Sequence, residues 1–265
     1  WRLRNMISVL SKCTLDDFEY LSGVLNSTFS FADDKGRKEL LEKYRTNPID
    51  ENKKLLLEKF DVQIRYFGSA DGAYLYRKIT GSGGEVSANE VVNDVADKLK
   101  VPQVPFGSTD TKLQHLIKAV VEKEFRSKSP DELSEALKKL MVKPEVIEEV
   151  LKETAKIGPI AVLPIIMQVA GKKAVIPIIE AIITGLVSRL IGVQAASLLA
   201  KEIGKRNPII NALGPVAWAI SGVWLAFDLQ GPAYSKTVPV CLYLGLVSLR
   251  DGGEDDLWRL TQVSN

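Results

Sequence analysis

An uncharged run in the last third of the chain, from Asn207 to Phe227, constrains the fold more than any other stretch. It is about twenty residues long, which is the length at which an apolar helix can cross a lipid bilayer. A second uncharged run, from Thr237 to Leu249, follows closely. Nearly everything from Ile157 to Arg250 therefore favours an apolar environment, which is either the core of a folded protein or a membrane.

Two further apolar arms precede these runs and predict a helical hairpin. They occupy residues 157–171 and 174–192, on either side of the turn at Lys172-Lys173, and each contains proline. Each arm is somewhat shorter than the ~20 residues that a perpendicular span requires, and buried helices of a bundle explain such lengths equally well. Glu180 and Arg189 fall within the second arm, so we expect each to be paired or to lie at a rim.

The first 156 residues are polar and show helix starts at several points. Hydroxyl residues with a carboxylate three positions later mark helix N-termini at Thr14, Ser87 and Ser129, and proline opens another helix at Pro144. Apolar residues recur at helical spacing between these caps, without the alternation typical of strands. The sequence predicts an all-α, multi-helix bundle with a polar N-terminal body (1–156), an apolar C-terminal helical assembly (157–250) and an acidic tail (251–265).

The net charge and the two cysteines indicate the class of partner and the cellular compartment. The net charge is only +2, and no zinc, helix-turn-helix or RNA-recognition pattern is present, which argues against nucleic-acid binding. Cys13 and Cys241 lie far apart in sequence, as is typical of a reduced, cytoplasmic protein. The first residues do not resemble a signal peptide. We expect a cytoplasmic protein, with attachment to or insertion in the inner membrane left open, and homo-oligomerisation open as well.

No residue pattern indicates catalysis, a cofactor or a metal. The glycine-rich stretch at Gly81–Gly84 lacks the following Lys-Ser/Thr of a phosphate loop. Asp94 and Asp97 lie three residues apart and could share a cation, but a solvated helix face is the better interpretation. His115 is the only histidine, and a metal site would need further ligands. We therefore predict a non-enzymatic protein without cofactor or metal.

The long uncharged run also carries the predicted contact surface. Small residues at helical spacing form a seam beside a ridge of tryptophans, an arrangement that lets helices approach closely in lipid or in a core. The residues predicted to contact a membrane or a partner are Lys172, Lys173, Gly214, Pro215, Trp218, Gly222, Trp224, Asp228, Gly231, Pro232 and Tyr234.

Two blocks of the sequence match a family pattern. The longer is Gly214-Pro215-x-x-Trp218-x-x-x-Gly222-x-Trp224-x-x-x-Asp228-x-x-Gly231-Pro232-Ala233-Tyr234, which continues through Thr237-Val238-Pro239 to Leu249-Arg250. The shorter comprises Ile64–Gly68 and Val91–Val101. Together they resemble the uncharacterised bacterial YaaW family, which has been grouped with ubiquinol-cytochrome c chaperones. The chain departs from that pattern at Ser235-Lys236, where such proteins often carry arginine. The resemblance implies no enzyme activity, substrate or cofactor.

Two hypotheses for the function follow. In the first, the apolar C-terminal helices associate with or insert into a membrane, as in a membrane-perturbing effector. In the second, the same helices form the core of a soluble assembly chaperone or protein-binding module. The partner is then membrane lipid in the first case and a protein client in the second.

Overall fold

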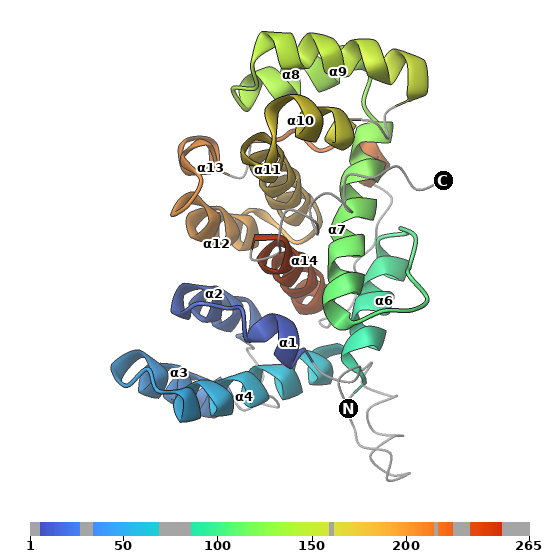
Figure 1. The fold of residues 1–265 in the computed structure, drawn as a ribbon. Helices are drawn as coiled ribbons and strands as arrows, with labels where there is room; N and C mark the ends of the chain where they lie inside the picture. The colour runs from blue at the N-terminus through green and yellow to red at the C-terminus, as the bar shows by residue number, and fades with distance from the viewer. Residues whose placement is uncertain are drawn as a thin grey trace. The chain divides into compact units, whose positions relative to one another are not determined.

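The computed structural model describes residues 6–26, 34–68, 86–158, 162–214, 217–224 and 234–250. Within these ranges the regular elements are all helices and no strand is present, which confirms the predicted all-α class (Figure 1). The chain divides into two compact units. Unit 1 comprises Trp1–Leu113 and Leu229–Ser248, and unit 2 comprises Gln114–Asp228 and Leu249–Asn265.

Unit 1 is built around a 19-residue helix, α4. Helix α4 contacts α1, α3 and α6, and α2 contacts α3. Figure 1 shows α3 and α4 lying side by side. The helices of this unit are α1 (Ile7–Leu10), α2 (Leu15–Leu25), α3 (Asp34–Thr46), α4 (Asp50–Gly68), α6 (Ala88–Lys98), the first turn of α7 (Thr109–Arg126) and most of α14 (Tyr234–Arg250).

The predicted helix starts are confirmed at atomic detail. The side chains of Thr14, Ser87 and Ser129 each accept a hydrogen bond from a backbone N–H three residues later, and a carboxylate there accepts one in return. These reciprocal bonds satisfy amide groups that the first helical turn leaves without partners. Pro144 occupies the first turn of its helix, where a missing N–H costs nothing.

Two carboxylates, one buried and one half-buried, join helices of unit 1. Asp17 is fully buried and accepts a hydrogen bond from the hydroxyl of Tyr243, on α14. Asp110, near the start of α7, accepts bonds from Ser8 at 2.6 Å and Lys12 at 2.5 Å. Burial acts to raise the pKa of Asp110, but the bonds from Lys12 and Ser8 outweigh it and leave that pKa below its ordinary value.

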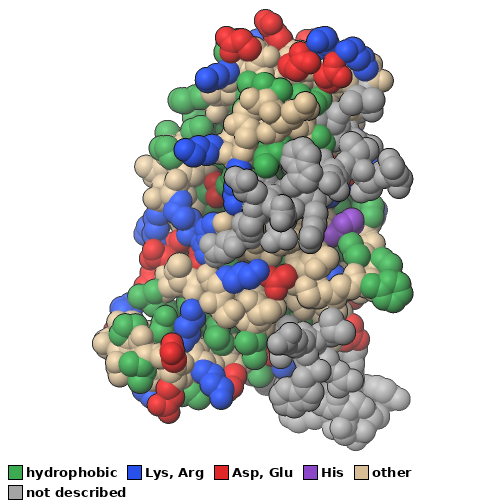
Figure 2. All heavy atoms as spheres, in the orientation of Figure 1, with side chains coloured by type: hydrophobic (Ala, Val, Ile, Leu, Met, Phe, Trp, Pro, Cys, Tyr) green, Lys and Arg blue, Asp and Glu red, His purple; other side chains and the backbone are tan. Residues whose placement is uncertain are grey.

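Unit 2 is arranged around α11, which contacts α10, α12 and α13, while α9 contacts both α8 and α10. In Figure 2, acidic and basic side chains are mixed over α8 and α9, and ion pairs on α9 include Lys152 with Glu149 and Lys156 with Glu153. Besides the rest of α7, the unit contains α8 (Pro130–Lys139), α9 (Pro144–Ile157), α10 (Val162–Ala170), α11 (Lys172–Leu190), α12 (Val193–Gly204), α13 (Pro208–Leu213) and a 3-10 turn, η3 (Gly222–Trp224).

Helices α10 and α11 are the predicted hairpin, with Gly171 at the turn. Most of the apolar residues of α11 are buried within the unit. Glu180 is half-buried and accepts a hydrogen bond from the amide of Asn207 at 2.7 Å, whereas Arg189 is exposed. Both charged residues therefore satisfy the expectation that they are paired or at a rim.

The uncharged run has the length and spacing of one apolar helix, but the structure does not form one there. Helix α13 ends at Leu213, where Gly214 takes φ 59°, and residues 217–221 are not helical. Glycine tolerates this left-handed backbone conformation. The apolar residues that follow at helical spacing lie in a loop instead of a helix. No helix within the described ranges combines the length and the apolar character needed to cross a membrane.

The two units cut across the predicted division between a polar body and an apolar assembly. That division, between residues 156 and 157, rests on charge and hydropathy and stays a prediction. The compact units place α8 and α9 with the apolar helices α10 to α13, and they place most of α14 in unit 1.

Candidate functional site

The candidate site lies in unit 2 and begins with a carboxylate on the apolar face of α7. Glu124 follows Val120 and Val121 by one helical turn, and all three side chains are buried, with Glu124 at 0% exposure. A carboxylate in such a place loses several kcal/mol of solvation unless other groups replace its water. Its partners must therefore come from elsewhere in the fold.

Those partners come from residues 217–224, which we call the tryptophan loop. The indole N–H groups of Trp218 and Trp224 donate to the carboxylate of Glu124 at 3.0 and 2.8 Å. The backbone N–H and hydroxyl of Ser221 donate to it at 3.1 and 2.7 Å. The ammonium of Lys128, whose side chain is 4% exposed, lies 3.2 Å from it. One carboxylate thus joins both tryptophans and the middle of the loop to α7.

Further contacts from the two residues that follow α7 fix the backbone of the loop. The ammonium of Lys128 donates to the carbonyl oxygen of Ala219 at 2.7 Å and lies 5.4 Å from the ring centroid of Trp218. The hydroxyl groups of Ser127 and Ser221 are hydrogen-bonded at 2.6 Å. The buried face of α7 and the residues just after its end therefore supply both apolar packing and polar partners for the loop.

Helix α11 holds the loop from its other side. A Cβ atom added at Gly185 would lie 2.7 Å from the backbone oxygen of Trp218 and 3.1 Å from the side chain of Ile220. Real Cβ atoms do not approach a backbone oxygen this closely, so only glycine allows the loop to cross α11 here. The tryptophan loop is consequently clamped between two helices.

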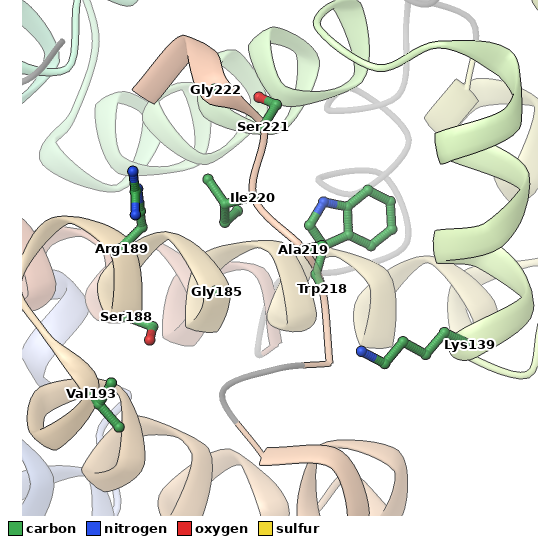
Figure 3. Close-up of a pocket in the computed structure, with 10 residues that line it drawn as sticks. All are labelled: Lys139, Gly185, Ser188, Arg189, Val193, Trp218, Ala219, Ile220, Ser221 and Gly222. Atoms are coloured by element: carbon green, nitrogen blue, oxygen red, sulfur yellow. The ribbon is translucent and has the colours of Figure 1, made fainter. Parts of the chain in front are cut away.

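A pocket of about 660 Å³ lies where the loop crosses α11. Figure 3 shows Arg189 and Lys139 approaching it from different helices, with Ile220 of the loop between them. The described lining residues include these two cations and no acidic side chain. They are Lys139, Gly185, Ser188, Arg189, Val193, Trp218, Ala219, Ile220, Ser221 and Gly222.

Three predicted contact residues belong to this loop, and two of them point inward. Trp218 and Trp224 are 2% and 1% exposed, so their side chains are not offered to a membrane or a partner in this conformation. Gly222 is exposed and lines the pocket. Their predicted role in contacting a membrane or a partner stays a prediction.

The other predicted contact residues do not gather at the pocket. Lys172 and Lys173 open α11, where Lys173 is exposed, and Gly214 ends α13. Tyr234 opens α14 in unit 1, where the ammonium of Lys98 lies 4.6 Å from its ring centroid. Pro215, Asp228, Gly231 and Pro232 lie outside the described residues.

Three central residues of the site escaped the sequence analysis: Glu124, Lys128 and Lys139. Glu124 had a detectable signal, because it falls on the apolar stripe of its helix, one turn after Val120. A lone carboxylate on such a stripe predicts a buried polar partner. Nothing local in the sequence identifies that partner, since the tryptophan loop lies 94 to 100 residues further along the chain.

No cluster of three His, Cys, Asp or Glu side chains suited to a metal ion occurs among the described residues. The pKa of His115 is lowered, first by burial and then by the charge of Lys118, which favours the neutral imidazole.

The fold and the pocket define a class: a helical protein with a loop clamped beside a ligand-sized basic pocket. The chain is similar to "UPF0174 protein" of Helicobacter pylori strain J99, with 26% identity over 193 residues, covering 73% of this chain and 71% of the relative. A second "UPF0174 protein", from Helicobacter pylori strain 26695, is 24% identical over 188 residues, covering 71% and 85%. No family model matches the chain, and no solved structure does.

Proposed function

We propose that this protein is a non-enzymatic helical binding module that uses the tryptophan loop and its pocket to bind a partner, with the apolar C-terminal helices as its core. The observation that carries the proposal is the buried carboxylate of Glu124, which gathers donors from the whole loop. Loops held on a rigid scaffold are where binding residues concentrate. The side of the loop away from Glu124 offers Ala219, Gly222 and Val223, which are exposed.

Burial of the apolar helices supports their role as core. Val175, Ile178, Ile182 and Leu186 of α11 are each at most 1% exposed. Their neighbours are α10, α12 and α13 of the same unit. Such burial stabilises the folded unit by about 1.5–3 kcal/mol for each large aliphatic side chain, and exposing the helix to lipid would forfeit that packing.

An assembly chaperone is one form that a binding module can take. The resemblance to the YaaW family, and through it to ubiquinol-cytochrome c chaperones, favours this form and rests on the motif residues alone. The H. pylori relatives carry names that give no activity. The proposed partner is therefore a protein or a small molecule of the cytoplasm.

Membrane association is the second candidate, and the turn between α10 and α11 favours it. Val169 is 49% exposed just before the turn, and Lys173 is exposed just after it. Apolar and basic side chains on one turn suit the surface of an anionic membrane. In this form the protein attaches peripherally through the turn while α11 stays buried.

Cell fractionation with a carbonate wash, applied to a matched pair of variants, tests the proposal. Ile182→Arg places a cation in the core of α11, whereas Leu198→Arg places one on α12 at a site that is 45% exposed. If the helices are core, wild type leaves the membrane fraction on washing. Ile182→Arg then loses folded protein because an unpaired charge is buried, and Leu198→Arg behaves as wild type.

Membrane insertion gives the opposite pattern. Wild type would then resist the wash, and Ile182→Arg would release a protein whose remaining helices stay folded, as judged by circular dichroism. That pair of results would overturn the core assignment. A third variant, Lys173→Glu, distinguishes peripheral attachment from both a buried core and membrane insertion. If the protein attaches peripherally, this variant should no longer bind anionic vesicles, and its stability should not change.

A further inference from the structure

The pocket beside the tryptophan loop holds a cation, Arg189, that makes no ion pair or hydrogen bond with any described residue. We propose that the pocket binds a small organic acid, whose single carboxylate meets Arg189 and whose apolar part lies against Ile220. The inference rests on the proposed function in taking this pocket as the binding site. It adds the chemical class of the ligand.

Arg189 provides the site for the carboxylate. Its side chain is exposed at the pocket wall. It lies in the last turn of α11, where the helix dipole favours a cation without using its N–H donors. A guanidinium presents those donors as a planar fork that matches a carboxylate. The fork is therefore available to a ligand.

The rest of the lining fits a ligand with one negative charge. Lys139 also lines the pocket, but it already has an interaction within the protein. The described lining residues include no acidic side chain that would repel a carboxylate. A ligand with a single carboxylate therefore matches the one charge that the described lining leaves without a partner.

The crossing of the loop over α11 places an apolar side chain beside this cation. Gly185 and Arg189 are four residues apart, so they lie one turn apart on the same face of α11. A Cβ atom added at Gly185 would lie 3.1 Å from the side chain of Ile220, so Ile220 packs over the glycine. Figure 3 shows Ile220 and Arg189 both lying between α11 and the loop. An acid held by Arg189 therefore has Ile220 close to its carbon chain.

The pocket has room for such a chain. Its volume of about 660 Å³ falls in the range of small-molecule pockets, which is roughly 300–1,000 Å³. Val193 is 68% exposed and adds apolar surface to the lining. A bare anion would leave this surface in water, whereas a carbon chain would cover it. Because Glu124 already fixes the loop, little ordering accompanies binding, and this favours affinity.

Isothermal titration calorimetry on the full chain tests the inference with a matched set of probes. Hexanoate carries both the charge and the chain, hexanamide lacks the charge, and acetate lacks most of the chain. We expect hexanoate to bind, and the other two to bind at least about tenfold more weakly. Octanoate should bind more tightly than hexanoate, by about fourfold for each added methylene that the pocket buries.

Two substitutions at Arg189 separate its charge from its geometry. Arg189→Gln should weaken hexanoate binding at least about tenfold, as loss of a charge-assisted hydrogen bond predicts. Arg189→Lys keeps the charge but loses the fork, so its affinity should fall between that of Arg189→Gln and that of wild type. Because Arg189 is exposed, both variants should keep the urea midpoint of wild type. The control, Lys173→Gln, removes an exposed cation of the same helix outside the pocket and should bind as wild type.

Ile220→Ala tests where the chain lies. It should weaken hexanoate binding by about threefold or more, because less apolar surface meets the chain, and it should leave acetate binding unchanged. Leu198→Ala is the control, since Leu198 is 45% exposed on α12 and is not among the pocket residues.

Three results would overturn the inference. The first is that hexanoate does not bind. The second is that hexanamide binds as tightly as hexanoate, or that Arg189→Gln binds hexanoate as wild type does. The third is that acetate or inorganic phosphate binds as tightly as hexanoate, which would indicate a site for a bare anion. None of them bears on the carbonate wash or on Ile182→Arg, so the core assignment in the proposed function stands or falls separately.

Discussion

Removing the carboxylate of Glu124 should release the tryptophan loop. In Glu124→Ala, the indole N–H groups of Trp218 and Trp224 and the backbone N–H of Ser221 lose their common acceptor. The ammonium of Lys128 loses its counter-charge in a place where its side chain is 4% exposed. Each of these groups must find water or leave the interior.

The size of the effect follows from the groups left behind. Breaking a buried ion pair by removing one partner costs about 3–5 kcal/mol. Each unsatisfied neutral donor adds about 1–3 kcal/mol, but the losses are not additive, because one movement of the loop rehydrates all the donors together. We expect Glu124→Ala to lower the free energy of unfolding by about 3–5 kcal/mol. Glu124→Gln, which keeps one oxygen acceptor, should cost less.

Urea denaturation followed by far-UV circular dichroism measures the loss. The matched control is Glu149→Gln on α9 of the same unit, because Glu149 lies 3.2 Å from Lys152 in an exposed ion pair. Such pairs contribute about 0–1 kcal/mol, so this variant should change little. Pairing Glu124→Gln with Lys128→Met removes both charges and should recover part of the loss.

Two results would refute this account of the loop. The first is a Glu124→Ala protein no less stable than Glu149→Gln, which would mean that water satisfies the donors without cost. The second is a double variant of Glu124 and Lys128 whose loss equals the sum of the single losses, which would mean that the ion pair carries no coupling energy.

Two other predictions concern unit 2. Gly185→Ala should lower the free energy of unfolding by about 1–3 kcal/mol, because the added Cβ would lie 2.7 Å from the carbonyl oxygen of Trp218. Urea denaturation measures this loss, and an unchanged midpoint would contradict the close crossing. Burial raises the pKa of Glu180, and the hydrogen bond from Asn207 offsets part of that rise. The protonated carboxyl therefore contributes stability below the pKa of Glu180 in the unfolded chain, and this contribution is lost as the pH rises through the higher pKa of the folded protein. Glu180→Gln lacks this loss, so its stability relative to wild type should improve as pH rises from about 4 to 8; a gap independent of pH would count against it.

The sequence by itself determined the all-α class and the starts of several helices. Capping pairs such as Ser129 with Glu132 act within one turn, and apolar residues repeat at helical spacing, so both signals are local. The same reasoning identified the hairpin of α10 and α11 and required Glu180 to find a partner. The helix starts depend only on neighbours along the chain, whereas the partner of Glu180 is Asn207, 27 residues further on, which the sequence did not identify.

Only the tertiary structure decided what becomes of the uncharged run. Its spacing fits a helix and its length fits a membrane, yet Gly214 ends α13 and the tryptophans turn toward α7. The physical reason is that indole N–H groups need an acceptor once buried, and theirs is Glu124, 94 and 100 residues earlier. Pairing over such distances leaves no periodic trace in a single sequence. The loop, its buried anchor and the basic pocket beside it therefore exist only once the chain has folded.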